Sequence, residues 1–361
     1  MNRASPVYVV IMAGGGGTRL WPMSRRQQPK HLLPICGENS MLVETYLRVH
    51  DLVPDDRLMV VTVAENATAV REALPSLVPQ NVVSEPVGRG TAPCLGLAAI
   101  LIGQQDPQAT MIALPADHAV KDTASFRSVL GAAVEAAQHG HLVTLGIHPH
   151  APETGYGYIE RGALLRQALG HEVYRVLRFT EKPNLAKAEE FVASGRYYWN
   201  AGIFAWRADA FLAEVQRLMP DLHGQLLAVR AALGTPEQAE ATARAWSGLR
   251  NASVDVGIME KAADVVVIPA DVGWSDVGSW TSVADLAEVD AQGNVLQGEH
   301  LALDCEDTFV RSSGRLVAAV GLRGMVVIDT GDAVLVCPKE RVQDVKKLVE
   351  QLDREGKSRY L

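Results

Sequence analysis

Apolar runs that alternate with helical patterns constrain the fold of this chain more than any other feature. The runs are found at residues 7–12, 58–63, 81–84, 111–114 and 142–147. Helical patterns lie between them, near residues 41–50, 91–103 and 126–138. Near-continuous apolar strands separated by helices are typical of a parallel sheet with both faces covered. We therefore predict an α/β fold whose ligands bind beyond the carboxyl ends of the strands.

The first apolar run leads into four glycines, 14–17, and then into Thr18 and Arg19, with Lys30 further along. Glycine lets the backbone reach conformations and distances that a Cβ atom forbids. Successive backbone N–H groups can then point at phosphate oxygens, and two cations add charge. A flexible turn is the alternative, but a plain turn needs no cations at its rim. The stretch therefore predicts a polyphosphate site.

Two common phosphate loops do not fit this spacing. The P-loop ends in Gly-Lys-Ser/Thr, whereas Gly17 is followed by Thr18 and Arg19. The dinucleotide pattern G-x-G-x-x-G fails because Arg19 stands where the third glycine belongs when Gly14 and Gly16 are the first two. A Rossmann oxidoreductase is therefore disfavoured.

Composition narrows the class of protein further. A chain of 361 residues fits two domains at about 150 residues per domain. Its net charge of -8 argues against a nucleic-acid partner. Its 4 cysteines form no CxxC pair, so neither a disulfide framework nor a zinc site is expected. No apolar run approaches the ~20 residues of a membrane span, and no signal peptide is visible. We expect a cytoplasmic protein without a membrane partner.

The pattern changes in the second half of the chain. Residues 156–160 and 173–179 alternate like more exposed strands, and helical patterns follow as far as residue 246. Beyond residue 290 the chain is rich in short strands, and it ends in a helical stripe of apolar residues between 342 and 352. We place the domain boundary so that residues 1–288 form one domain and residues 289–361 form a small β-rich domain with a terminal helix.

The opening motif, Gly-Gly-x-Gly-Thr-Arg-Leu-x-Pro followed by Pro-Lys, resembles the signature of sugar-1-phosphate nucleotidyltransferases. Within that family, residues 21–25 and 29–33 look most like mannose-1-phosphate guanylyltransferases. The similarity continues through Asp117 and through segments 179–183, 199–202 and 273–280, so it covers roughly the first 285 residues.

The resemblance implies a Rossmann-like, mainly parallel mixed sheet flanked by helices, with a small C-terminal β domain of left-handed β-helix type. It implies transfer of GMP from GTP to mannose 1-phosphate, with Mg²⁺ as cofactor, and self-association as a homodimer through the C-terminal region. Some relatives carry an additional isomerase domain, for which residues 289–361 are too short. No hexapeptide repeat of a β-helix can be read in this chain.

The resemblance also assigns residues to the reaction. Arg19 and Lys30 match the cations at the triphosphate and the leaving pyrophosphate. Asp117 and Asp276 match the magnesium ligands, although either aspartate could instead cap a turn or a helix. Mg²⁺ prefers few carboxylates together with phosphate oxygens, so two aspartates suffice. The predicted catalytic set consists of Arg19, Lys30, Asp117 and Lys182.

A second group of matching residues belongs to the sugar phosphate. By resemblance, Glu181 contacts the sugar and Lys182 its phosphate, although such a pair is also a common surface ion pair. Asn200 and Gly202 match a polar side chain and a close approach at the sugar. Gly155 matches a further sugar-side loop, for which a glycine-rich hairpin is the alternative.

A third group is predicted to bind the nucleotide: Gly14, Gly15, Gly17, Thr18, Arg19, Glu85, Gly88 and Thr91. Thr91 could equally cap the helix that follows it. By resemblance, Asn is the usual residue where this chain has Gly90, so the side-chain contact of that Asn is absent here. We expect His31 and His118 to be structural neighbours of the site.

Other functions stay open on the sequence alone. The chain could use another sugar 1-phosphate or another nucleoside triphosphate, because base choice depends on a few hydrogen bonds in a shared pocket. It could also be a non-catalytic regulatory subunit that binds nucleotide sugars. That class predicts lost cations or carboxylates, yet the predicted catalytic and metal residues are all present.

Overall fold

A nine-stranded sheet organises the larger of two units into which the chain divides. The computed structural model describes residues 5–361. The larger unit, called the large unit here, contains residues 5–14 together with Thr45–Ala116 and Val120–Trp274. The small unit contains Gly15–Glu44, Asp117–Ala119 and Ser275–Leu361.

The sheet of the large unit has the strand order β3-β2-β1-β4-β9-β6-β10-β8-β7. Its strands are β1 (Val7–Ala13), β2 (Leu58–Val63), β3 (Val82–Glu85), β4 (Thr110–Pro115), β6 (Leu142–Ile147), β7 (Tyr158–Ala168), β8 (His171–Thr180), β9 (Tyr197–Arg207) and β10 (Val265–Pro269). All five apolar runs of the first half are therefore strands, as predicted.

Parallel pairing holds the first four neighbours together, since β1 pairs in parallel with β2 and β4, and β2 with β3. Six successive residues of β1 are buried, which means that both of its faces are covered. Met12 of β1 lies beside Pro115 of β4, so the two strands end at the same edge of the sheet. The glycine run and Asp117 follow these two strand ends in the sequence.

The rest of the sheet is mixed. Strand β9 pairs antiparallel with both β4 and β6, and β7 and β8 form an antiparallel hairpin. Strand β9 was not predicted, although its sequence is rich in apolar and aromatic residues and most of its side chains are buried. Strand β10 pairs in parallel with β6. Its apolar run, residues 265–269, is a visible strand signal that the sequence analysis missed.

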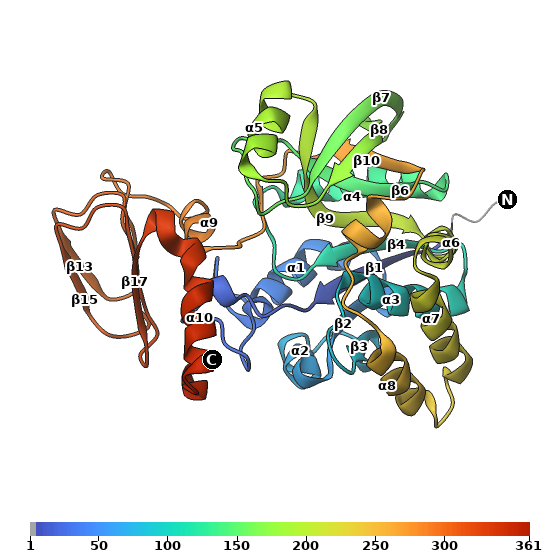
Figure 1. Ribbon diagram of the computed structural model, residues 1–361, viewed down its shortest axis with the longest axis horizontal. Coiled ribbons are helices and arrows are strands. Elements are labelled where there is room, and N and C mark those ends of the chain that lie inside the picture. Colours follow the sequence, from blue (N-terminus) through green and yellow to red (C-terminus); the bar gives the residue numbers. More distant parts are fainter. Residues whose placement is uncertain (1–4) are drawn as a thin grey trace. The chain divides into compact units, whose positions relative to one another are not determined.

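Helices cover the sheet of the large unit (Figure 1). Alternate residues of β1, Tyr8 and Val10, join the core cluster of α3, and α4 packs on β4, β6 and β9. The helices are α1 (Met41–Val49, which begins in the small unit), α2 (Ala67–Ala73), α3 (Thr91–Gln105), α4 (Thr123–Gln138), α5 (Leu185–Ser194), α6 (Ala208–Leu218), α7 (Pro220–Ala232) and α8 (Gln238–Gly248), with a π-helix at Asp255–Met259.

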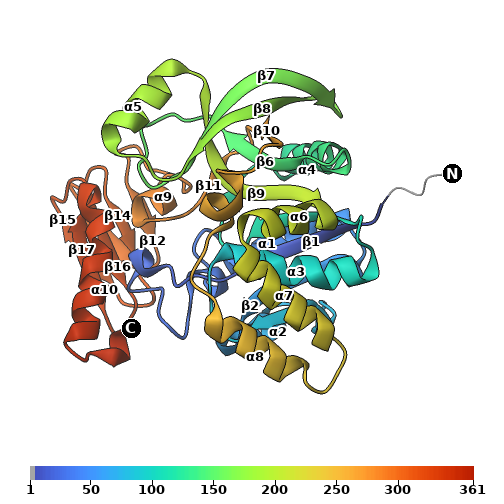
Figure 2. The ribbon, with the colours of Figure 1, turned by 45° about the vertical axis from the view of Figure 1, so that its right-hand side comes forward.

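The strands of the small unit form two ladders. Several of these strands are labelled in Figure 2. They are β12 (Val295–Gln297), β13 (His300–Leu303), β14 (Phe309–Arg311), β15 (Val317–Val320), β16 (Met325–Asp329) and β17 (Val334–Pro338). Strands β12, β14 and β16 pair in parallel, as do β13 and β15, so the strands from β12 to β16 alternate between the ladders. Strand β17 then pairs antiparallel with β16 in the same ladder. This alternation is the winding of a β-helix. Helix α9 (Trp280–Ala284) precedes these strands and α10 (Val345–Arg354) follows them.

The core of the small unit also contains part of the glycine-rich opening segment. Leu20 is buried in the same cluster as Trp280 and Phe309. The indole N–H of Trp280 donates to the Trp21 carbonyl oxygen over 2.9 Å, and Arg311 donates to the carbonyl oxygens of residues 34 and 35, each over 2.7 Å. The C-terminal strands therefore support the segment that follows the glycines.

These findings confirm the predicted fold class, a mixed sheet flanked by helices with a C-terminal β-helix-like domain. The boundary between residues 288 and 289 stays a prediction. Two-residue strands, β5 (Ala119–Val120) and β11 (Trp274–Ser275), stand where the chain passes from one unit to the other. Across residues 5–361, the helices are too short or too polar to cross a bilayer.

Candidate functional site

The glycine loop is held in place by its own small-unit contacts. Gly17 has a φ of +62°, and a Cβ atom there would lie 2.5 Å from Cβ of Lys30. The buried Ser24 hydroxyl donates to the Gly17 carbonyl oxygen over 2.6 Å. By contrast, a Cβ atom on Gly15 or Gly16 would meet nothing within 4 Å. Gly17 is thus required for packing, whereas the glycines before it leave open space beside the backbone.

Lys30 is the most buried cation of the predicted site, with 5% of its surface exposed. Its Nζ lies 2.8 Å from Oδ2 of Asp117 and 2.6 Å from the backbone carbonyl oxygen of Asp276. Burial opposes ionisation of Asp117, but Lys30 and His118 beside it hold the pKa of this carboxyl below its ordinary value. Asp117 is therefore a carboxylate at neutral pH.

A cavity of about 320 Å³ in the small unit brings together the predicted phosphate and metal residues. Arg19 and Lys30 line it with Asp117 and Asp276, although these residues are far apart in the sequence. Its other lining residues are Gly17, Thr18, Leu20, His118, Gly278 and Lys346. Lys346 comes from α10 and was missed, because a lysine on an amphipathic terminal helix carries no signal of its own.

The donor set of this cavity fits Mg²⁺ only together with substrate oxygens. Asp117 and Asp276 offer carboxylates, and an Oδ of Asp276 accepts the Gly278 N–H over 3.1 Å. No cluster of three or more His, Cys, Asp or Glu side chains that could hold a metal ion exists among residues 5–361. Two carboxylates beside phosphate oxygens and water are what Mg²⁺ commonly uses in phosphoryl-transfer sites.

His31 follows Lys30 and is buried, with 1% of its surface exposed. Neither ring nitrogen has a hydrogen-bond partner within the described chain. Burial lowers the pKa of His31 to about 4, with Asp117 opposing and Lys30 reinforcing the shift. The ring is therefore neutral at pH 7, in keeping with the structural role expected for it.

The predicted sugar residues lie in the large unit: directly after β8, along β9, and in the loop before β7. Glu181 and Lys182 form an ion pair, and Lys182 has a φ of +46°. A Cβ atom on Gly157 would lie 2.6 Å from Oε2 of Glu181 and 3.3 Å from Cβ of Asn200. Gly155 is exposed and a Cβ atom there would meet nothing within 4 Å. Of the two glycines in this loop, Gly157 is therefore the one that packs against the predicted sugar residues.

Asn200 has a fixed amide. Its Oδ1 accepts the Thr144 hydroxyl and the Gly202 N–H, each over 3.1 Å, and its Nδ2 donates to Oδ1 of Asp255 over 2.8 Å. The Glu181 N–H donates to Glu260 over 3.0 Å. Asp255 and Glu260 were missed by the sequence analysis, where the segment Ser-Val-Asp before Met-Glu, residues 253–260, carried the only available signal.

The predicted base residues precede and begin α3. Glu85 is buried and accepts the Trp246 indole N–H over 3.2 Å, and burial raises its pKa to about 7. Gly88 is exposed. The N-cap of α3 is Gly90, not Thr91, and the Thr91 hydroxyl accepts the Val254 N–H over 2.9 Å. The capping alternative for Thr91 is therefore wrong.

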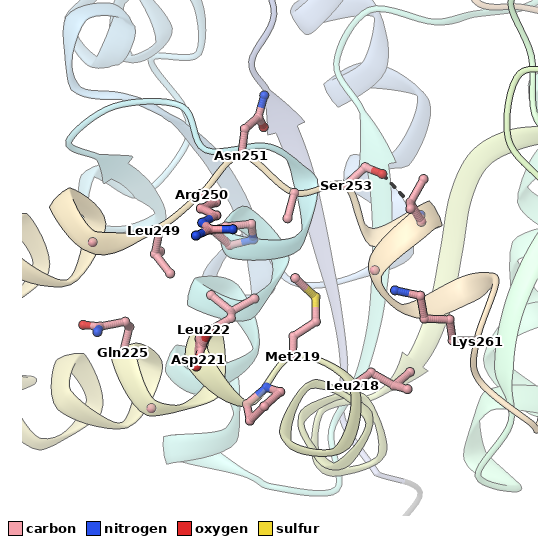
Figure 3. Close-up of a pocket in the computed structure, with 17 residues that line it drawn as sticks. Leu218, Met219, Asp221, Leu222, Gln225, Leu249, Arg250, Asn251, Ser253 and Lys261 are labelled. Atoms are coloured by element: carbon pink, nitrogen blue, oxygen red, sulfur yellow. Dashed lines mark hydrogen bonds between the residues drawn. The ribbon is translucent and has the colours of Figure 1, made fainter.

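Gly90 itself has a φ of +88° and a ψ of 177°, and a Cβ atom there would lie 2.4 Å from the carbonyl oxygen of Ala252. Ala252 also donates its N–H to the Arg89 carbonyl oxygen over 2.9 Å. Residues 249–253, which make these contacts, form one wall of a cavity of about 1120 Å³ that α7 also lines (Figure 3). Arg250, Asn251 and Lys261 supply polar groups to this cavity, which no sequence motif predicted.

Comparisons with known proteins place this geometry in context. Residues 8–293 match the family described as nucleotidyl transferase, and residues 298–352 match the MannoseP isomerase/GMP-like beta-helix domain. The chain is 44% identical over 354 residues to a mannose-1-phosphate guanylyltransferase of Klebsiella pneumoniae, covering 97% of this chain and 75% of that protein.

Two further similarities agree with this. The xanthan biosynthesis protein XanB of Xanthomonas campestris pv. campestris (strain B100) is 42% identical over 98% of this chain and 75% of its own length. A crystal structure from Thermus thermophilus, described as a mannose-1-phosphate geranyltransferase, superimposes with a TM-score of 0.86 at 35% identity. The superposition covers 96% of this chain and 99% of that one.

Proposed function

The chain belongs to the nucleotidyl transferase family, and on this premise we propose that it transfers GMP from GTP to mannose 1-phosphate, giving GDP-mannose and pyrophosphate. This is the family that the motifs indicated, and its curated relatives at about 40% identity are mannose-1-phosphate guanylyltransferases. The observation that carries the proposal is the small-unit cavity, which three cationic side chains line together with the carboxylates of Asp117 and Asp276.

The reaction joins the sugar phosphate to the α-phosphorus of GTP. A phosphate oxygen of mannose 1-phosphate attacks the α-phosphorus in line, and the bond from that phosphorus to the β-phosphate oxygen breaks to release pyrophosphate. A phosphate monoester has its second pKa at about 6, so the nucleophile is already ionised at neutral pH. The enzyme therefore needs positioning and charge neutralisation and no general base.

Arg19 and Lys30 are assigned to the triphosphate. Lys30 is buried, and its Nζ is held by Asp117 and the Asp276 carbonyl oxygen, so it presents a fixed point charge. Arg19 is exposed on the loop and can follow the leaving pyrophosphate. Asp117 and Asp276 would hold Mg²⁺, which when bound neutralises phosphate charge and fixes phosphate geometry.

The remaining predicted residues are assigned to the ends of the two substrates. Lys182 neutralises the sugar phosphate. Glu181 accepts hydrogen bonds from sugar hydroxyl groups, and Asn200 donates one to a hydroxyl group. Gly155 and Gly202 are also assigned to the sugar. The open glycines Gly14 and Gly15, with Gly17 and Thr18, bind the triphosphate through backbone N–H groups. Gly88 and Thr91 lie at the start of α3 and are assigned to the base; Glu85 supports them from the core.

We also propose that the protein is a homodimer in the cytoplasm. Its four cysteines, Cys36, Cys94, Cys305 and Cys337, are free thiols, as a reducing compartment favours. Exposed leucine and valine side chains on β13 and β15 support association through the small unit.

Pyrophosphate release with Mg²⁺, measured over four nucleoside triphosphates and several sugar 1-phosphates, tests the function. We expect release to require both GTP and mannose 1-phosphate, and Arg19→Ala to lose at least about a hundredfold in turnover. Arg26→Ala, on the same loop but outside the cavity lining, is the matched control.

Two other outcomes would overturn parts of this assignment. Release with a different pair would keep the reaction and change the substrates. No release from any pair, together with tight binding of GDP-mannose in calorimetry, would identify a regulatory subunit instead.

A further inference from the structure

The π-helix at Asp255–Met259 presents a carboxylate to the predicted sugar residues. This segment is anchored, because Val254 and Ile258 are buried in the core and the Val254 N–H donates to Thr91. Asp255 between these anchors accepts a hydrogen bond from Asn200, and Glu260 at the far end accepts one from Glu181. Single-turn π-helices are rare and often mark functional sites.

The contacts of Asn200 show what Asp255 does to it. The amide oxygen already receives two donors, Thr144 and Gly202, and one amide N–H is committed to Asp255. These three bonds fix which edge of the amide carries the N–H groups, since turning the amide over would oppose donor to donor at Gly202 and acceptor to acceptor at Asp255. One N–H of Asn200 remains for a substrate hydroxyl.

We propose that Asp255 is a positioning residue of the sugar site, which orients the Asn200 amide so that it donates to a hydroxyl of the hexose in the sugar 1-phosphate. The proposal rests on the function proposed above and names the side chain on which recognition of the sugar depends. Asp255 acts through Asn200 and takes no part in phosphoryl transfer.

The environment of Asp255 is unfavourable for a carboxylate that serves the fold alone. Burial, together with the charge of Glu181 nearby, raises its pKa to about 6, and the hydrogen bond from Asn200 and the charge of Lys182 oppose the shift. A neutral side chain would avoid that electrostatic strain. Groups whose pKa is shifted by burial and by a specific charged neighbour cluster at functional sites.

The charged groups that shift the pKa of Asp255 are Glu181, which raises it, and Lys182, which lowers it. Because Asp255 is ionised above about pH 6, its hold on the Asn200 N–H is strongest there and weakens as the pH falls. Mannose 1-phosphate also titrates at about pH 6, but it does so identically for every variant of the enzyme. The ratio of KM values between Asp255→Asn and wild type therefore reports on Asp255 alone.

The experiment measures pyrophosphate release by the full chain with GTP, mannose 1-phosphate and Mg²⁺ between pH 5.5 and 8.5. We expect Asp255→Ala to raise KM for mannose 1-phosphate about tenfold at pH 8 and to change KM for GTP less than twofold. Asp255→Asn, which keeps an acceptor oxygen without the charge, should raise KM for mannose 1-phosphate about threefold at pH 8. That difference from wild type should vanish below pH 6. Asp56→Ala, an exposed aspartate of the same unit, is the matched control and should behave as wild type.

Two results would overturn the proposal. One is an Asp255→Ala enzyme whose KM for mannose 1-phosphate stays within twofold of the control. The other is an equal loss with both substrates, accompanied by a lower Tm and a pH-independent KM ratio for Asp255→Asn, which would identify a purely structural residue. Failure of the proposed function would instead appear in the wild-type enzyme, as no release with this pair of substrates.

Discussion

Lys30 and Asp117 form an ion pair of 2.8 Å in which the lysine is almost fully buried and 29% of the aspartate side chain is exposed. The lysine is further fixed by the Asp276 carbonyl oxygen. A buried ammonium needs its partners, because an unpaired charge in the interior is costly. The pair therefore supports the fold of the small unit as well as the proposed chemistry, and this double role can be tested.

Asp117→Asn should abolish turnover and also lower the free energy of unfolding by about 1–3 kcal/mol, since a hydrogen bond to a charged group becomes a weaker neutral one. Arg19→Ala should reduce turnover at least about a hundredfold without that loss of stability, because Arg19 is exposed and no ion pair of it is seen in the described chain. Thermal unfolding and pyrophosphate release measured on both variants would check this. Equal Tm values for the two variants would contradict it.

Gly17→Ala should destabilise the small unit, because a Cβ atom would lie 2.5 Å from Cβ of Lys30 and the residue has a φ of +62°. Moving Lys30 should also reduce turnover at least about tenfold. Gly16→Ala is the matched control for stability, since its Cβ atom would meet nothing within 4 Å. Denaturant unfolding should give free energies of unfolding that differ by about 1–2 kcal/mol between the two variants. Identical midpoints would show that the loop relaxes around the alanine.

Gly90→Asn introduces the residue that the resemblance led us to expect at this position, and we expect this chain to reject it. The backbone of Gly90, with φ +88° and ψ 177°, lies in a region essentially restricted to glycine, and the new Cβ atom would meet the Ala252 carbonyl oxygen at 2.4 Å. The free energy of unfolding should fall by about 2 kcal/mol. For Gly88→Ala, whose nearest neighbour would be a Val63 methyl group at 3.5 Å, it should fall by less than about 1 kcal/mol. A fully stable Gly90→Asn protein would show that residues 251–252 move aside.

Much of this architecture could be predicted, and the contacts within the site that could not be predicted share one cause. The strands at 7–12 and 58–63 were visible because each is a continuous apolar run that both faces of the sheet bury. The Lys30–Asp117 pair joins residues far apart in the chain, and only the family motifs brought them together before the structure did. Asp255 lies in the segment 253–260, but nothing in that segment indicated a sugar site, since its role appears only when the π-helix meets the Asn200 side chain. Local sequence thus predicts elements, whereas contacts between distant segments require the fold.

Association through the small unit can be tested on the ladder of β13 and β15. Leu301 and Leu303 stand beside Ala318 and Val320, and the three larger side chains are 58% to 67% exposed. Leu301→Asp should convert a dimer into a monomer at micromolar concentration in light scattering, because a buried unpaired carboxylate is unfavourable. Leu169→Asp, an equally exposed leucine of the large unit, is the control. A monomeric wild type would refute the proposed homodimer.

Glu85 makes the stability of the fold depend on pH in a direction that can be calculated. Burial raises its pKa from 4.5 to about 7, against the opposing hydrogen bonds from Trp246 and Cys94. Between these values the folded chain binds a proton that the unfolded chain has released, so this residue's contribution to the free energy of unfolding falls as the pH rises. Glu85→Gln stays neutral and escapes that loss, and its glutamine oxygen can still accept from Trp246.

The variant should therefore gain stability relative to wild type as the pH rises from 4.5 to 7.5, by at most about 3 kcal/mol. Urea unfolding at a series of pH values measures the difference. Other titrating groups, His31 among them, are common to both proteins and cancel in it. Glu65→Gln, at an exposed glutamate, should show a flat difference over the same range. A flat difference for Glu85→Gln as well would mean that Glu85 is ionised at pH 5 in the folded protein, and that water or a cation reaches it beside Trp246.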